Sequence, residues 1–304
     1  PSISSAASDV YKRQATAGDL IGDWRNDGIA GVSIDSRSIK SDELFVAVKA
    51  KRDGHNFIND AIRLGAKGAL VDHIPADISS NTPLLLVPSV QEALENLGKY
   101  RRDRSQAKLV AITGSVGKTS SKNMLKTILE LQGKTHASPA SFNNYLGVPL
   151  TLANLPIDAT YAVVEIGMNK PGEIEPLARM TSADVVLITA IGKAHLKAFG
   201  DIAGIAHEKA QIVKGLKSGG IAVLNADTPG YEILKKQTIK NGSQFISFGG
   251  IDGNLRAKKM QKLNGRIKVQ CQFNDRDLEF IVGSSGFHFA ENSLLSNNHF
   301  SMSL

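Results

Sequence analysis

The feature that most constrains the fold of this chain is an apolar run that leads into a glycine-containing loop and a helical pattern. This stretch reads "KLVAITGSVGKTSSKNML" and begins at Lys108. The run has the length of a buried strand, Gly114 and Gly117 permit a tight turn, and a helix is expected to begin near Lys118. Such an arrangement points backbone N–H groups and the positive end of a helix at an anion. It predicts a phosphate-binding loop.

The loop departs from the strict phosphate-loop pattern, because Ile112 stands where that pattern has its first glycine. An ordinary glycine-rich turn is the alternative. Strand, glycine pair, Lys-Thr and helix nevertheless occur in register, which favours nucleotide binding. Lys118 is expected to contact the β- and γ-phosphates and the Thr119 hydroxyl to ligate Mg²⁺. The predicted nucleotide contacts are Gly114, Ser115, Val116, Gly117, Lys118, Thr119 and Ser120.

Strand-like and helix-like runs alternate along the rest of the chain, which predicts an α/β fold. Residues 15–88 read as a small N-terminal α/β domain, and residues 89–107 as a connecting helix with Ser89 as its N-cap. Residues 108–304 read as a doubly wound, mostly parallel ATP-binding domain. Beyond Asn254, alternating polarity and an Asn-Gly turn predict antiparallel strands at an edge of the sheet.

Composition narrows the class of protein. The 304 residues carry a formal charge of +7 that is spread along the chain, which favours binding of anionic small molecules over nucleic acid. The single cysteine, Cys271, excludes an intrachain disulfide and a multi-cysteine zinc site. No apolar run has the length of a membrane span, so we expect a cytoplasmic, monomeric protein without membrane insertion.

Both ends of the sequence look unusual. Residues 1–14 lack the apolar core of a signal peptide and resemble translated adapter sequence, so they are predicted to be a non-native or disordered leader. The final "SNNHFSMSL" interrupts an apparent helix with polar residues, which suggests a truncation or a reading-frame slip.

Several segments in order resemble the Mur ligases, the ATP-dependent amide-forming enzymes of peptidoglycan assembly. They are "DSRSIKSDELFVAVKAKRDGHNF", "TGSVGKTSSK", "FNNYLGVPLTL", "VVEIGMNKPGEI" and "IGKAHLKAFGDIAGIAHEKAQI". The resemblance implies an N-terminal domain for a UDP-linked substrate, a central ATPase domain, and a C-terminal domain that this chain would lack, so that it would turn over poorly. "NNYLGVPLTL" and "EIGMN" favour the member that joins D-alanyl-D-alanine to UDP-N-acetylmuramoyl-tripeptide through an acyl phosphate.

The resemblance also implies roles for individual residues. Glu165, His195 and Lys209 would join Thr119 in holding two Mg²⁺ ions, with Lys209 as a carbamate; Lys118, His195 and Lys209 would be catalytic. Asn143 and Asn144 would face the muramoyl peptide, and Ser36 and Arg37 the uridine nucleotide. Asn292 would lie near the adenine. From the sequence alone, each has an ordinary alternative: a strand-end carboxylate, a structural histidine, a surface lysine or turn asparagines.

The chain departs from the family pattern at Lys197, Gln211 and Phe289, where Glu, an acidic residue and Asn are usual. None of these positions is a proposed metal ligand. The alternatives are the sister ligase that adds the third peptide residue, a folate polyglutamate ligase, a noncatalytic nucleotide-binding module, and a small-molecule kinase. The "DSR" and "DGH" segments do not separate the two sister ligases, whereas "NNYLGVPLTL" argues against the sister ligase and the folate enzyme.

Overall fold

The computed structural model describes residue 16 and residues 18–24, 28–249, 253–273 and 276–283. Within these residues the chain forms two compact units. The first comprises the described residues up to 104 together with residues 149–155, and the second comprises residues 105–148 and the described residues from 156 to 283. The helix expected as a connector groups with the first unit.

The first unit is built on a five-stranded sheet with the order β1-β5-β4-β3-β2. Its strands are β1 (Asp19–Ile21), β2 (Gly31–Ser33), β3 (Glu43–Val46), β4 (Gly68–Val71) and β5 (Leu84–Leu86). Strands β2 to β5 are parallel and β1 is antiparallel to β5. The 3-10 helices η1 (Ser36–Ser38) and η2 (Gly54–Phe57) and the helices α2 (Ile58–Arg63) and α3 (Val90–Asp103) complete it. Apolar side chains of β3, β4 and α2 form its core, among them Phe45, Ile58 and Val71.

The predicted elements of this unit are present. Helix α2 ends just before Gly65, whose φ of 105° is a conformation that glycine adopts without strain. Ser89 caps α3, since its side chain accepts a hydrogen bond from the Glu92 N–H. The sequence pattern did not predict the three-residue strands β1 (DLI) and β2 (GVS), which belong to no longer apolar run, whereas the equally short β5 lies within the apolar run PLLLV.

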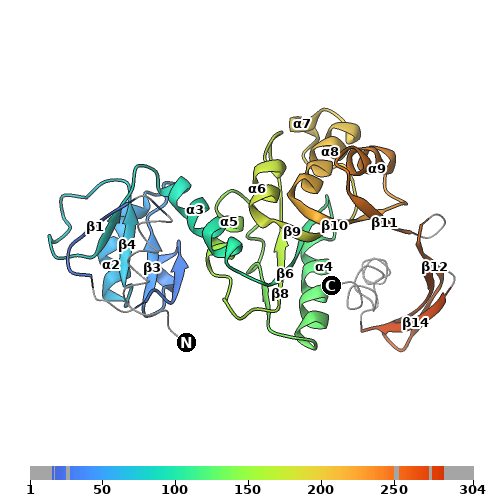
Figure 1. Ribbon diagram of the computed structural model, residues 1–304, viewed down its shortest axis with the longest axis horizontal. Coiled ribbons are helices and arrows are strands. Elements are labelled where there is room, and N and C mark those ends of the chain that lie inside the picture. Colours follow the sequence, from blue (N-terminus) through green and yellow to red (C-terminus); the bar gives the residue numbers. More distant parts are fainter. Residues whose placement is uncertain (1–15, 17, 25–27, 250–252, 274–275, 284–304) are drawn as a thin grey trace. The chain divides into compact units, whose positions relative to one another are not determined.

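The second unit is built on a nine-stranded sheet with the order β14-β13-β12-β11-β10-β9-β6-β8-β7 (Figure 1). Its strands are β6 (Lys108–Thr113), β7 (Thr135–Ala137), β8 (Tyr161–Glu165), β9 (Ala183–Ile188), β10 (Leu216–Asn225), β11 (Gln244–Gly249), β12 (Leu255–Leu263), β13 (Arg266–Phe273) and β14 (Arg276–Val282). Pairing is parallel from β7 to β12 and antiparallel from β12 to β14. The doubly wound, mostly parallel α/β prediction is confirmed.

Helices flank the parallel strands of this sheet: α4 (Lys118–Glu130), α6 (Ile174–Thr181), α7 (Leu196–Phe199), α8 (Ile202–Ala210) and α9 (Tyr231–Lys240), with the 3-10 helix η3 (Gln211–Gly215). Helix α5 (Gly147–Ala153) begins in this unit, and its later residues group with the first unit. The core is lined by β6, β8 and β9 and by Leu125 and Leu129 of α4. At the far edge, Asn264 and Gly265 both have positive φ and join β12 to β13 as the predicted Asn-Gly turn.

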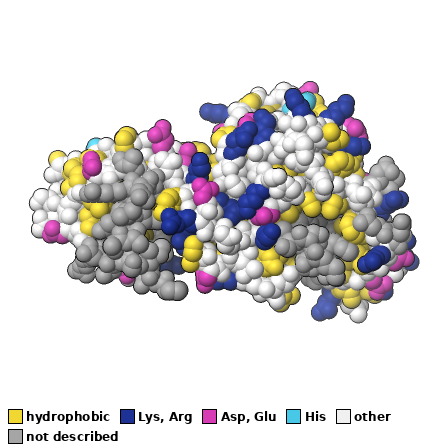
Figure 2. All heavy atoms as spheres, in the orientation of Figure 1, with side chains coloured by type: hydrophobic (Ala, Val, Ile, Leu, Met, Phe, Trp, Pro, Cys, Tyr) yellow, Lys and Arg dark blue, Asp and Glu magenta, His cyan; other side chains and the backbone are white. Residues whose placement is uncertain are grey.

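The described residues include no helix both long and apolar enough to cross a lipid bilayer. On the face drawn in Figure 2, Lys and Arg side chains lie in several separate groups over the surface. This agrees with the even spread of basic residues along the sequence.

Candidate functional site

The predicted phosphate loop lies where the order of strands reverses in the second unit. Strand β6 leads into the loop, β8 lies on one side of β6 and β9 on the other. In doubly wound sheets, ligands bind at the carboxyl ends of strands at this reversal. Gly117 is the N-cap of α4 with a φ of 87°, and Gly114 has a φ of 156°. A β-carbon on Gly114 would lie 1.9 Å from the Thr189 hydroxyl, so the loop requires glycine there.

Not every loop group is available to a phosphate. The Ser115 N–H donates to the Ala190 carbonyl over 2.6 Å, and the Ser115 hydroxyl donates to the Gly192 carbonyl over 3.2 Å. The Lys118 ammonium donates to the Gly114 carbonyl over 2.8 Å. Burial lowers the pKa of Lys118, although Glu165 opposes the shift. The lysine therefore lies folded over its own loop, in a low-dielectric setting where its charge acts strongly on an anion.

Thr119 and Glu165, the predicted metal ligands closest to the loop, are in direct contact. The Thr119 hydroxyl donates to Glu165 Oε2 over 2.9 Å, and the Asn143 amide donates to Oε1 over 2.7 Å. Glu165 is only 1% exposed at the end of β8. It is thus a buried carboxylate held by partners, not the solvated strand-end group that the sequence alone suggested.

A cavity of about 180 Å³ brings several predicted residues together around the loop. His195, one of the residues that line the cavity, is the N-cap residue of α7. Its φ of 61° is a left-handed backbone conformation, which is uncommon outside glycine and often occurs at functional sites. The residues that line the cavity include Gly114, Ser115, Lys118, Asn143, Asn144, His195 and Lys209.

Lys209 is buried on α8 and only 2% exposed, which overturns the reading of this residue as a surface lysine. The pKa of Lys209 is lowered to about 7, mainly by burial and also by the Lys118 ammonium, while Glu208 opposes the shift. The Glu208 carboxylate accepts hydrogen bonds from the backbone N–H groups of Gly172 and Ile174, each over 2.9 Å. This contact ties α8 to the start of α6 and thereby fixes the position of Lys209.

Lys122, which the sequence patterns did not single out, is a further buried cation of the site. It is 2% exposed, lies 3.9 Å from Glu165 Oε2, and donates to the carbonyls of Ser138 and Ala140. Lys122 therefore links α4 to the segment before Asn143 and partly neutralises Glu165. One signal in the sequence was available: Lys122 lies three and seven positions before Leu125 and Leu129, on the face that α4 buries.

The remaining predicted residues lie elsewhere or have another structural role. Asn144 caps the start of α5, since its side-chain oxygen accepts from the N–H groups of Leu146 and Gly147. In the first unit, Ser36 is buried in η1, and Arg37 forms a two-pronged pair with Asp35 at 2.9 and 2.7 Å. Asn292 lies outside the described residues, as does the expected leader. Asp53, in the "DGH" segment, is the N-cap of η2.

Comparison with known proteins places the chain in a family that uses this architecture. The Mur ligase middle domain matches residues 112–298, and the Mur ligase family catalytic domain matches residues 28–102. This chain belongs to the Mur ligase family.

Within the family, the chain is similar to ligases of one particular name. The chain is 36% identical over 266 residues to a UDP-N-acetylmuramoyl-tripeptide–D-alanyl-D-alanine ligase of Rickettsia prowazekii, a match that covers 86% of this chain and 58% of the relative. It is 34% identical to the enzyme of that name from Haemophilus influenzae, over 94% of this chain and 62% of the relative. The chain thus spans about three-fifths of the length of these two relatives.

Solved structures of MurF ligases have a similar fold. A crystal structure of MurF from Acinetobacter baumannii superposes with a TM-score of 0.85 at 30% identity, covering 97% of this chain and 63% of that one. MurF ligase from Thermotoga maritima, solved in complex with ADP, superposes with a TM-score of 0.74 at 27% identity, covering 88% of this chain and 61% of that one.

Proposed function

We propose that this chain supplies the nucleotide site and the UDP-substrate site of a cytoplasmic, monomeric ligase that joins D-alanyl-D-alanine to UDP-N-acetylmuramoyl-tripeptide. The observation that carries the proposal is the cavity at the phosphate loop, where Lys118, Asn143, His195 and Lys209 converge beside the Thr119–Glu165 pair. The names of the relatives support this substrate pair. We also propose the domain boundaries predicted from the sequence: a UDP-substrate domain at residues 15–88, a connecting helix at 89–107 and an ATP-binding domain at 108–304.

In the proposed reaction, the γ-phosphoryl group of ATP passes to the tripeptide carboxylate, giving ADP and an acyl phosphate. The amine of D-alanyl-D-alanine then attacks the acyl carbon, the amide bond forms, and inorganic phosphate leaves. Such a transfer needs alignment and charge neutralisation more than covalent help from the protein. Lys118 would leave the Gly114 carbonyl and donate to the β- and γ-phosphates. The N–H groups at the start of α4 would hold the same phosphates.

The residues present fit magnesium. The Thr119 hydroxyl and the Glu165 carboxylate are hard oxygen donors 2.9 Å apart, the ligand type that Mg²⁺ prefers. Magnesium bound there neutralises negative charge on the triphosphate. Asn143 would keep Glu165 oriented from its other oxygen.

His195 and Lys209 would hold a second magnesium ion, with Lys209 as a carbamate. A carbamate forms when a neutral amine attacks CO₂ and loses a proton, which converts a cation into an anionic oxygen ligand. The pKa of about 7 that burial gives Lys209 supplies that neutral amine near neutral pH. Gln211, where the family pattern has an acidic residue, donates from its side-chain amide to the His207 carbonyl over 2.9 Å.

Calorimetric titration tests the proposal. The chain is titrated with UDP-N-acetylmuramoyl-tripeptide, and separately with a nonhydrolysable ATP analogue with and without Mg²⁺. We expect saturable binding of both ligands. Lys118→Met should abolish most nucleotide binding and leave binding of the uridine substrate intact, whereas Arg37→Ala should do the reverse. Nucleotide binding with no detectable uridine substrate would contradict the substrate assignment and leave a generic ATP-binding module.

A further inference from the structure

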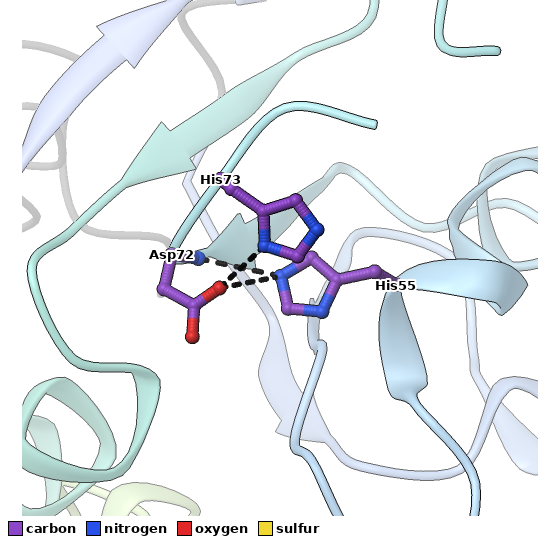
Figure 3. Close-up of side chains that lie close together, drawn as sticks. All are labelled: His55, Asp72 and His73. Atoms are coloured by element: carbon purple, nitrogen blue, oxygen red, sulfur yellow. Dashed lines mark hydrogen bonds and ion pairs between the residues drawn. The ribbon is translucent and has the colours of Figure 1, made fainter. Parts of the chain in front are cut away.

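Three side chains with metal-ligating atoms, none of them assigned a role above, meet at one edge of the first unit's sheet. His55 lies in η2, which follows β3, and Asp72 and His73 come directly after β4 (Figure 3). Strands β3 and β4 are parallel neighbours, so the cluster lies at their shared carboxyl ends. This is the edge at which parallel sheets place ligands.

The ligand atoms of the cluster converge on one point. The distance to Asp72 Oδ1 is 3.3 Å from His55 Nε2 and 2.6 Å from His73 Nδ1, and all three atoms lie within 4.8 Å of one another. Ligand atoms about 2.1 Å from a single ion are themselves separated by about 3 Å, so small shifts would admit an ion. The two imidazole rings stack with centroids 4.1 Å apart, and in Figure 3 both rings turn nitrogen atoms toward the Asp72 carboxylate.

A second carboxylate prepares His55 for this role. The Asp53 carboxylate oxygen Oδ1 lies 2.7 Å from His55 Nδ1, and the Asp72 N–H donates to His55 Nε2 over 3.3 Å. Nδ1 therefore carries the proton that Asp53 accepts, and Nε2 is the unprotonated nitrogen; a metal ion bound at Nε2 would replace the Asp72 N–H as its partner. Metal-ligating histidines commonly donate their other ring nitrogen to a carboxylate in this way, which fixes the ring and its tautomer. The His55 side chain is 2% exposed, so its orientation is held by packing as well.

Two features of the surroundings matter for affinity and access. The Lys49 ammonium lies 3.0 Å from Asp72 Oδ2, where it orients the carboxylate but opposes a cation by charge. The His73 side chain is 49% exposed, which gives an ion a route from solvent.

We propose that His55, Asp72 and His73 bind one divalent transition-metal ion, of the Zn²⁺, Co²⁺ or Ni²⁺ class. Two imidazole nitrogens and one carboxylate suit these ions, whereas Mg²⁺ prefers oxygen ligands. The remaining coordination positions would be filled by water or by an anionic ligand. This site is separate from the phosphate loop and does not depend on the ligase reaction proposed above.

Titration of the full chain with Co²⁺, followed by visible absorption, tests the proposal. We expect one equivalent of Co²⁺ to bind with d–d bands typical of nitrogen and oxygen ligation, and Zn²⁺ to displace it. His73→Ala should weaken binding by more than tenfold. Asp53→Asn removes the negative charge behind His55 while keeping an oxygen that can cap η2, and it should weaken binding by about 10- to 100-fold. Lys49→Gln should tighten binding, because it removes the opposing charge.

Controls separate this site from other histidines and from loss of folding. His207→Ala changes an exposed histidine of the second unit and should leave the Co²⁺ spectrum and affinity unchanged. His73→Ala should keep the metal-free thermal midpoint, because its side chain is half exposed. The proposal is overturned if no Co²⁺ spectrum develops, if His73→Ala binds like the parent chain, or if His195→Ala removes the signal instead. The cluster would then be a hydrogen-bonded network that only fastens η2 to β4.

Discussion

Charged residues are used in opposite ways at the two sites that the sequence predicted. At the phosphate loop, Glu165, Lys122 and Lys209 are 1–2% exposed and are held among partners from several elements. At the predicted uridine site, the Arg37 side chain is 87% exposed and pairs with a near neighbour in sequence, Asp35. A buried charge must be compensated by the fold, whereas an exposed one is compensated by water. The loop site is therefore built into the stability of its unit, and the Arg37 pair is not.

The largest effect should come from Lys122. Lys122→Met leaves the Glu165 carboxylate without its nearest cation and removes the donor to the Ser138 and Ala140 carbonyls. Loss of one partner from a buried pair costs about 3–5 kcal/mol, so urea unfolding should show a fall of about 3 kcal/mol in the free energy of unfolding. Lys126→Met, on the same helix, removes only an exposed pair with Glu130 and should cost less than about 0.5 kcal/mol. Equal losses of unfolding free energy in Lys122→Met and Lys126→Met would contradict the contrast between buried and exposed charges.

Replacing Lys209 should raise the free energy of unfolding, whereas replacing Lys122 should lower it. Its pKa is about 7 in the folded chain and about 10.5 when unfolded, so the buried cation costs stability in full below pH 7. That cost falls as the pH rises from 7 to 10.5, by at most about 1.4 kcal/mol per pH unit. In buffers free of CO₂, Lys209→Met should raise the free energy of unfolding at pH 7 by about 2 kcal/mol, and the gain should shrink toward pH 10.

Urea unfolding at several pH values measures this difference. The exposed Lys197→Met is the matched variant and should show no gain that varies with pH. A Lys209→Met gain that is constant from pH 7 to pH 10 would mean that burial of the amine does not shift its titration.

The smallest effect on stability is expected at Arg37. Arg37→Ala breaks only its surface pair with Asp35, so the thermal midpoint should not move measurably in a calorimetric scan. The same variant should weaken binding of UDP-N-acetylmuramoyl-tripeptide, because a phosphate fork is lost. If the variant melts earlier while binding is unchanged, Arg37 is a structural residue and not a contact for the substrate.

The sequence predicted the parts of the fold that periodicity and turn chemistry encode. The strand ending at Thr113, the helix from Lys118 and the Asn-Gly turn at Asn264 all lie where expected. Each depends on neighbours within a few residues. The resemblance to the Mur ligases, not periodicity, drew attention to Glu165 and Lys209.

The sequence did not predict how the site residues are held, because those contacts are distant along the chain. Along the sequence, Asn143 lies 22 residues from Glu165, to which it donates a hydrogen bond. Glu208 lies 34 residues from Ile174, whose N–H donates to its carboxylate. No local pattern encodes such pairs. Lys209 was interpreted as a surface lysine because lysine is seldom fully buried, and only the packed fold reveals the exception. Asn144 has a role that its motif did not indicate: it lines the cavity, and its side-chain oxygen also caps the start of α5.

The most direct test of the central claim is the magnesium dependence of nucleotide binding in Glu165→Gln. In calorimetric titrations with a nonhydrolysable ATP analogue, Mg²⁺ should strengthen binding to the parent chain and to the exposed control Glu130→Gln. In Glu165→Gln the strengthening by Mg²⁺ should fall by at least about tenfold, with binding in the absence of Mg²⁺ retained. The same magnesium dependence in all three proteins would contradict the claim that the buried carboxylate at the end of β8 builds the nucleotide–metal site.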